Sequence, residues 1–117
     1  MNNCEEFLKS LDKKTKILNI SNIGLKGVLN LRDFKYLEEL YCSKNEITEI
    51  RNIPKNILYL DCGFNKLKVL NLYYWTYENL EELYCNDNNI EKLMIPKNIK
   101  KVNSANNKIS KLEYNIN

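Results

Sequence analysis

Two stretches of the sequence repeat one another: VLNLRDFKYLEELYCSKNEITEIRNIPKNILYLDCGFNKL over residues 28–67, and VLNLYYWTYENLEELYCNDNNIEKLMIPKNIKKVNSANNKI over residues 69–109. The second stretch matches the first after a two-residue insertion near Trp75 and a one-residue deletion before Ile95. The chain therefore contains a duplication of about 42 residues. Self-similarity of this kind is typical of proteins built from stacked structural repeats.

Each half of the duplication divides again into copies of a shorter unit with the pattern LxxLxLxxNxL. Five copies begin at residues 15, 37, 57, 80 and 99, with spacings of 22, 20, 23 and 19 residues. The first copy is the weakest, because Ile23 stands where the others have asparagine. The sixth position is a cysteine in the three middle copies. The asparagines in register are Asn45, Asn65, Asn88 and Asn107.

The apolar residues of the LxxLxL segment alternate, which is the period of a strand with one buried face. A single copy cannot bury its own apolar row, and stacking of neighbours makes the core continuous. The sequence therefore predicts parallel strands stacked roughly 4.8 Å apart, in a five-stranded sheet about 20 Å wide.

The LxxLxLxxNxL unit resembles the leucine-rich-repeat family, from residue 15 to at least residue 112. The resemblance implies an α/β solenoid: a horseshoe fragment with a five-stranded parallel sheet on its concave face and mostly irregular convex arms. It also implies that the four asparagines form a buried ladder that satisfies backbone groups at the turns. The short proline-bearing arms at residues 53–57 and 95–99 are similar to repeats found in bacterial effectors and large-virus proteins.

The two ends of the chain are predicted to differ. Phe7, Leu8 and Leu11 fall at helical spacing, so we expect an amphipathic helix over residues 3–13, within an N-terminal segment 1–14 that caps the first strand. Residues 15–117 then form the five repeats. No cap follows Leu112, which leaves the strand at residues 99–104 as a possible open edge. Phe34 and Trp75, in the longer arms, are expected to pack behind the sheet.

The sequence contains little that could carry catalysis. It has no histidine and three glycines, and it lacks nucleotide-binding and nucleophile-elbow motifs. We therefore expect no enzyme activity, no cofactor and no metal. Cys42, Cys62 and Cys85 take the same inward position in successive repeats, where cysteine behaves as a small buried hydrophobe. We expect free thiols, because in-register parallel strands aim neighbouring Cβ atoms the same way.

Strand residues that do not face the core line the concave face, which solenoids commonly present to partners. In the middle three repeats this face concentrates aromatic and acidic side chains, although the chain has a net charge of +3. Tyrosine is enriched in binding hot spots. The alternative is that the tyrosines only pack across strands. The candidate partner-binding residues are Glu39, Tyr41, Tyr59, Asp61, Phe64, Glu82, Tyr84 and Asp87.

The pattern favours a non-catalytic protein–protein interaction module that binds another protein or a basic peptide on the concave face. One alternative is a structural or self-assembling solenoid joined through its uncapped C-terminal edge. The chain is expected to be a monomer or an edge-mediated dimer. Nucleic-acid binding is disfavoured, because Arg32 and Arg51 are the only arginines among 18 basic residues. It would use Lys97, Lys100, Lys101, Lys108 and Lys111. The first residues lack a continuous apolar stretch, which predicts a cytoplasmic protein, in the host if it is viral or an effector, with no membrane partner.

Overall fold

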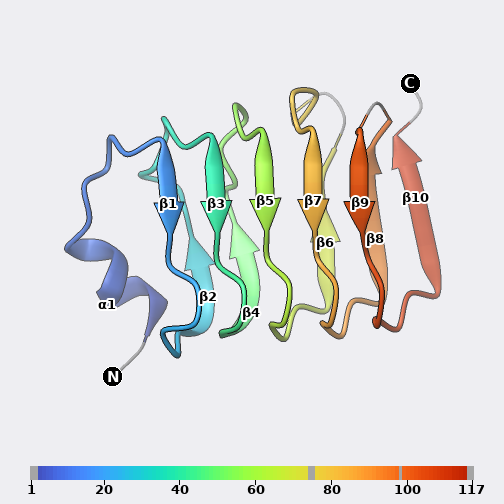
Figure 1. Ribbon diagram of the computed structural model, residues 1–117, viewed down its shortest axis with the longest axis horizontal. Coiled ribbons are helices and arrows are strands. Elements are labelled where there is room, and N and C mark those ends of the chain that lie inside the picture. Colours follow the sequence, from blue (N-terminus) through green and yellow to red (C-terminus); the bar gives the residue numbers. More distant parts are fainter. Residues whose placement is uncertain (1–2, 74–75, 98, 116–117) are drawn as a thin grey trace.

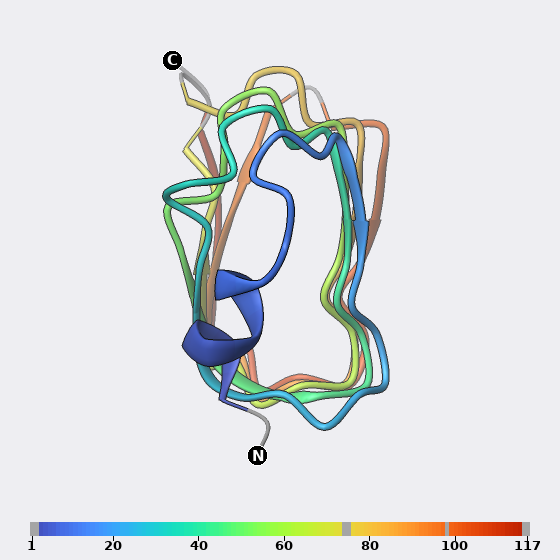
Figure 2. The same ribbon diagram turned by 90° about the vertical axis from the view of Figure 1, so that its left-hand side faces the viewer.

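The computed structural model describes residues 3–73, 76–97 and 99–115. In this part the chain winds as a β-solenoid: each coil crosses the front of the molecule as one strand and the back as another (Figure 1). Seen along the solenoid axis, the coils superpose as a flattened ring with the strands on its two long sides (Figure 2). The principal-axis extents are 38 × 27 × 17 Å.

The predicted five-stranded parallel sheet is confirmed, and we call it the front sheet. Its strand order is β1-β3-β5-β7-β9, so successive coils are neighbours. The strands pair in strict register, with the fourth position of each unit aligned from Leu18 to Val102. The strands are β1 (Ile17–Asn19), β3 (Glu39–Tyr41), β5 (Tyr59–Asp61), β7 (Glu82–Tyr84) and β9 (Lys101–Asn103).

The expectation of mostly irregular arms is wrong, because the back of each coil also forms a strand. Apolar residues alternate there too: Leu29 and Leu31 are buried, as are Leu70 and Leu72. A period of two with one buried face is the pattern of a strand. These strands form two parallel sheets, β2-β4 and β10-β8-β6. They are β2 (Lys26–Asn30), β4 (Glu46–Arg51), β6 (Val69–Asn71), β8 (Lys92–Pro96) and β10 (Lys111–Asn115).

The fold is therefore a β-solenoid with little helix rather than an α/β solenoid. The N-terminal helix α1 (Cys4–Lys9) is six residues long, shorter than the predicted 3–13. Asn3 caps its N-terminus, and the Asn3 side chain accepts hydrogen bonds from the backbone N–H groups of Glu5 and Glu6. The helix contacts β2, a back strand, rather than the first front strand. Figure 2 shows it across one part of the end of the ring.

The interior of the ring is filled by buried side chains from both the front and the back of each coil. Leu40, Leu60 and Leu83 are fully buried. Cys42, Cys62 and Cys85 are also fully buried, and they are free thiols as predicted. Burial raises the pKa of these three thiols, that of Cys85 to about 12. Phe34 packs in this core as expected, whereas Trp75 lies outside the described residues.

The asparagine ladder is present and joins each coil to the one before it. The Asn65 side-chain oxygen accepts a hydrogen bond from the Ile47 N–H at 3.0 Å, and its amide nitrogen donates to the Cys42 carbonyl at 3.0 Å. The same nitrogen donates to the Cys62 carbonyl of its own coil at 3.1 Å. Asn45, Asn88 and Asn107 repeat this arrangement. Each asparagine thus satisfies backbone groups of two successive coils.

The ladder predicts that Asn65→Ala destabilises the protein far more than Asn56→Ala. Asn65 is 8% exposed and its loss leaves buried backbone groups without partners, whereas Asn56 is exposed on a turn. The expected difference is about 1–3 kcal/mol in the free energy of unfolding, measured by urea denaturation. Equal loss of stability in the two variants would contradict the role of the ladder.

Candidate functional site

The in-register front sheet places the predicted binding residues on one outward surface. Six of the eight lie on β3, β5 and β7, and Phe64 and Asp87 lie in the turns that follow β5 and β7. Over the three middle strands, the outward columns are symmetric about β5. Across the sheet, the fifth position of the unit reads Asn19, Tyr41, Asp61, Tyr84 and Asn103, and the third position reads Ile17, Glu39, Tyr59, Glu82 and Lys101.

Tyr41, Tyr59 and Tyr84 form a continuous aromatic row across three strands, which we call the tyrosine row. The ring centroids of Tyr41 and Tyr59 are 5.1 Å apart, and those of Tyr59 and Tyr84 are 5.5 Å apart. The rings are tilted by 38° and 36°, an arrangement in which aromatic rings attract one another. The tyrosines therefore do pack across strands, and this packing also fixes them as a half-buried aromatic surface.

A glutamate on the same strand holds each outer tyrosine of the row. The Tyr41 hydroxyl donates a hydrogen bond to Glu39 Oε1 at 2.7 Å, and the Tyr84 hydroxyl donates to Glu82 Oε1 at 2.7 Å. We call these two units the tyrosine–glutamate pairs. The hydrogen bond to Glu39 raises the pKa of Tyr41 to about 12, and the bond to Glu82 raises the pKa of Tyr84 as well. Both phenols stay protonated near neutral pH, with the carboxylates as acceptors.

The two aspartates of the predicted site have local hydrogen-bonding roles. Asp61 Oδ1 accepts a hydrogen bond from the Gly63 N–H at 3.2 Å, which is the turn contact that asparagine makes at the same position of the first and last coils. Asp87 accepts one hydrogen bond at each oxygen, from the side-chain amides of Asn86 and Asn106. Asp87 is therefore the acidic residue of the predicted set that is most fully engaged within the protein.

Phe64 stands out by its backbone conformation. The eighth position of each unit has a positive φ, from 53° to 58°, and the other four coils carry asparagine, lysine or aspartate there. A bulky residue in this region is uncommon, because its Cβ approaches the carbonyl oxygen. Phe64 nevertheless takes φ of 54°, and it is 50% exposed. An aromatic ring exposed at a strained position is a candidate contact residue.

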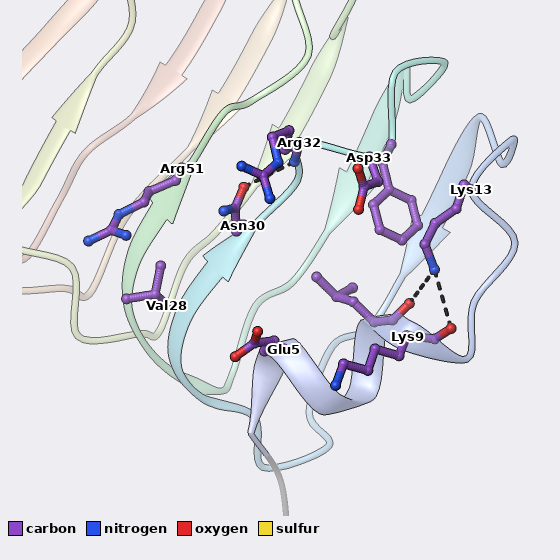
Figure 3. Close-up of a pocket in the computed structure, with 10 residues that line it drawn as sticks. Glu5, Lys9, Lys13, Val28, Asn30, Arg32, Asp33 and Arg51 are labelled. Carbon is purple, nitrogen blue, oxygen red and sulfur yellow. Dashed lines mark hydrogen bonds between the residues drawn. The ribbon is translucent and has the colours of Figure 1, made fainter.

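A pocket of about 440 Å³, which no sequence pattern indicates, lies between α1 and the outer side of β2 (Figure 3). The position of α1 brings together the segments of the chain that line this pocket. Residues of both charge signs line it, among them Glu5, Lys9, Lys13, Arg32 and Asp33. The Lys13 ammonium donates to backbone carbonyls at the end of α1, so this lysine fastens the helix.

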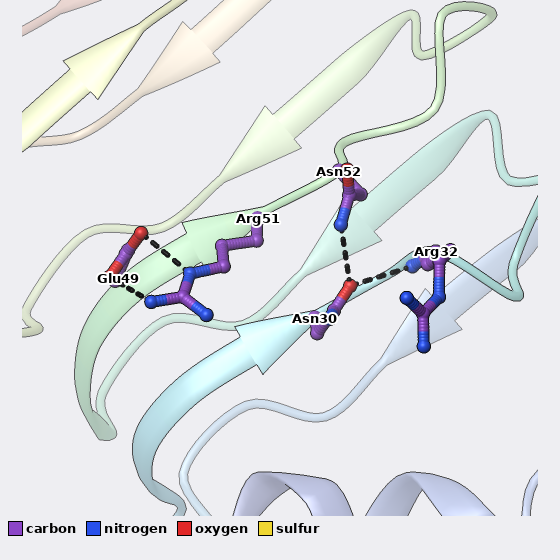
Figure 4. A network of polar contacts seen from close by, with 5 residues as sticks. All are labelled: Asn30, Arg32, Glu49, Arg51 and Asn52. Atoms are coloured by element: carbon purple, nitrogen blue, oxygen red, sulfur yellow. Dashed lines mark hydrogen bonds and ion pairs between the residues drawn. The ribbon is translucent and has the colours of Figure 1, made fainter.

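A polar network crosses the outer side of β2 and β4 beside this pocket (Figure 4). The Asn30 side-chain oxygen accepts from the Arg32 N–H at 3.1 Å and from the Asn52 amide at 2.9 Å. Arg51 pairs with Glu49 at 2.8 Å. Both arginines of the chain are therefore on this surface, but Arg51 already has a carboxylate partner. Because this surface carries both positive and negative side chains, it indicates the charge of a ligand less clearly than the front sheet does.

The described residues contain no group of three or more metal-ligating side chains. No helix among them is long and apolar enough to cross a membrane. Comparison with protein-family models, with curated proteins and with solved structures finds no match.

Proposed function

We propose that the protein is a non-catalytic interaction module that binds a basic peptide or protein segment on the outward surface of the front sheet. The observation that carries this proposal is the tyrosine row with its two tyrosine–glutamate pairs. Aromatic rings provide contact area at low entropic cost, and adjacent carboxylates attract cationic side chains. Cations are also attracted to the faces of tyrosine rings.

The charge distribution supports this choice. Glu39, Asp61 and Glu82 lie on the three middle strands, whereas Lys101 lies on the last strand. A chain of net charge +3 thus carries an acidic centre on this surface. Electrostatic complementarity would speed the encounter with a basic partner and orient it on the sheet.

Further features are part of the same proposal. The repeats are leucine-rich repeats of the short 19–23-residue type, curved so that the front sheet is the concave face of a horseshoe. Helix α1 acts as a cap for the first coil, and the protein works in the cytoplasm. The repeated asparagine contacts support the family assignment, because the resemblance implies a ladder of this kind.

Self-assembly through the C-terminal edge is the second candidate, supported by the edge positions of β9 and β10. The asparagine ladder weakens head-to-tail stacking of identical chains. Each coil is joined to the preceding one through its own asparagine, and the first coil offers Ile23 at that position. If a second copy were placed after β9, its first coil would therefore have no asparagine amide to bond the last coil of the first copy. Particle size measured over a range of protein concentrations separates the two candidates.

Binding of a fluorescently labelled octalysine peptide tests the proposed function. Tyr41→Ala and Tyr84→Ala should each weaken binding by about 1–2 kcal/mol, because truncation removes a central aromatic contact. Asp61→Lys should weaken binding further and slow association, since it places a cation between the two pairs. Lys55→Glu, on an exposed turn of the back, is the control and should bind like the wild type. Tyrosine variants that bind normally would refute the assigned surface.

Phe64→Asn separates binding from stability. Asparagine tolerates a positive φ better than phenylalanine, so thermal unfolding should show a gain of about 1 kcal/mol in stability. Peptide binding should become weaker, because the exposed ring is lost. A variant that is more stable and binds as well as the wild type would show that Phe64 has no part in recognition.

A further inference from the structure

The two tyrosine–glutamate pairs are copies of one another. Residues 37–42 and 80–85 both read LEELYC, and both pairs have a hydrogen bond of 2.7 Å. Through the register, Tyr41 aligns with Asp61 and Asp61 with Tyr84, so the pairs are separated by two strand spacings. Neighbouring strands lie about 4.7–4.9 Å apart, which places the pairs roughly 9.4–9.8 Å from each other. Because the strands are parallel, the two pairs also point the same way.

The strand between the pairs provides an aromatic floor. On β5 the order of the residue types is reversed, so Tyr59 takes the position that glutamate takes on β3 and β7. Its ring therefore lies between the outer tyrosines, 5.1 Å from one and 5.5 Å from the other. A ligand that spans both pairs must cross this ring. Its middle portion must be able to pack on an aromatic surface.

The glutamate of each tyrosine–glutamate pair can accept further hydrogen bonds from a ligand. Glu39 and Glu82 use Oε1 for the tyrosine hydroxyl, and within the described residues Oε2 of each carboxylate has no hydrogen bond. A carboxylate can accept several hydrogen bonds, so each pair can receive one ammonium or guanidinium group beside a tyrosine ring. The site therefore requires two cations on the same side of a ligand, about 9.5 Å apart.

Among regular peptide conformations, the polyproline II helix meets this requirement most closely. It has three residues per turn and a rise of about 3.1 Å, so residues i and i+3 lie on one side, roughly 9.3 Å apart. A β-strand alternates its side chains, and its same-side neighbours at i and i+2 are only about 6.6–6.8 Å apart. Proline rings between the cations also pack well on aromatic surfaces, as in other grooves that bind this conformation.

We propose that the front sheet recognises a peptide segment in the polyproline II conformation with two lysines or arginines three residues apart. The segment crosses β3, β5 and β7, with one cation on each tyrosine–glutamate pair and its intervening residues on Tyr59. This inference rests on the proposed function and adds the spacing and conformation of the partner.

The test compares three proline-rich peptides of the same length and composition. Each has two lysines, and the second lysine comes two, three or four residues after the first. The three-residue spacing should bind about tenfold more tightly than the other two, because only it engages both pairs at once. Equal binding of all three peptides would overturn the spacing rule while leaving the proposed function intact. If no peptide binds, including octalysine, the proposed function fails as well.

Two matched variants test whether the tyrosine–glutamate pairs select the spacing of the lysines. Glu39→Gln removes one carboxylate, so the three-residue peptide should lose its advantage and bind like the others. Glu38→Gln makes the same charge change one residue earlier, at a side chain that does not bond the tyrosine row within the described part of the chain. It should keep the preference for three-residue spacing. Loss of the preference in both variants would indicate a general charge effect and contradict the inference.

Discussion

The asparagine that reaches back to the preceding coil is the contact on which the rest of this structure depends. One side chain satisfies the backbone of two coils, as when Asn88 accepts from the Leu67 N–H and donates to the Cys62 and Cys85 carbonyls. Buried backbone groups without partners are costly, so the contact fixes both the turn and the spacing between coils. It also accounts for Ile23 in the first repeat, because Asn45 of the second coil accepts a hydrogen bond from the Ile23 N–H, and the described residues before this repeat include helix α1 rather than another coil.

Because the spacing between coils is fixed, residues at the same position of successive repeats lie in columns across the sheet. The register of β3, β5 and β7 brings residues about 20 positions apart into direct contact, and the tyrosine row is the result. The packed rings and the hydrogen bonds to Glu39 and Glu82 hold this surface in place before any ligand arrives. A preorganised surface loses less entropy on binding, which is consistent with the binding function that we propose.

The front strands and the asparagine ladder follow from the recurring LxxLxLxxNxL unit, whereas the back strands and the contacts of individual side chains were not predicted from it. The LxxLxL segments gave the front strands, and the asparagine spacing predicted the ladder. The back strands were missed, although Leu70 and Leu72 alternate as strand residues do, because the leucine-rich-repeat resemblance favours irregular arms. Periodicity also extended the helix beyond Lys9, where the structure ends it. The candidate residues were found from their columns, but the engagement of Asp87 by two neighbouring amides depends on rotamers that a pattern does not specify.

Recognition on the front sheet, as we propose it, is tested most directly by mapping the contact surface with NMR. Backbone amide shifts would be followed while the octalysine peptide is titrated into the isotope-labelled protein. The largest changes should fall on β3, β5 and β7, centred on Tyr59, with small changes on the back strands. Changes concentrated around α1 and the pocket near Arg32, with the front sheet unaffected, would contradict it.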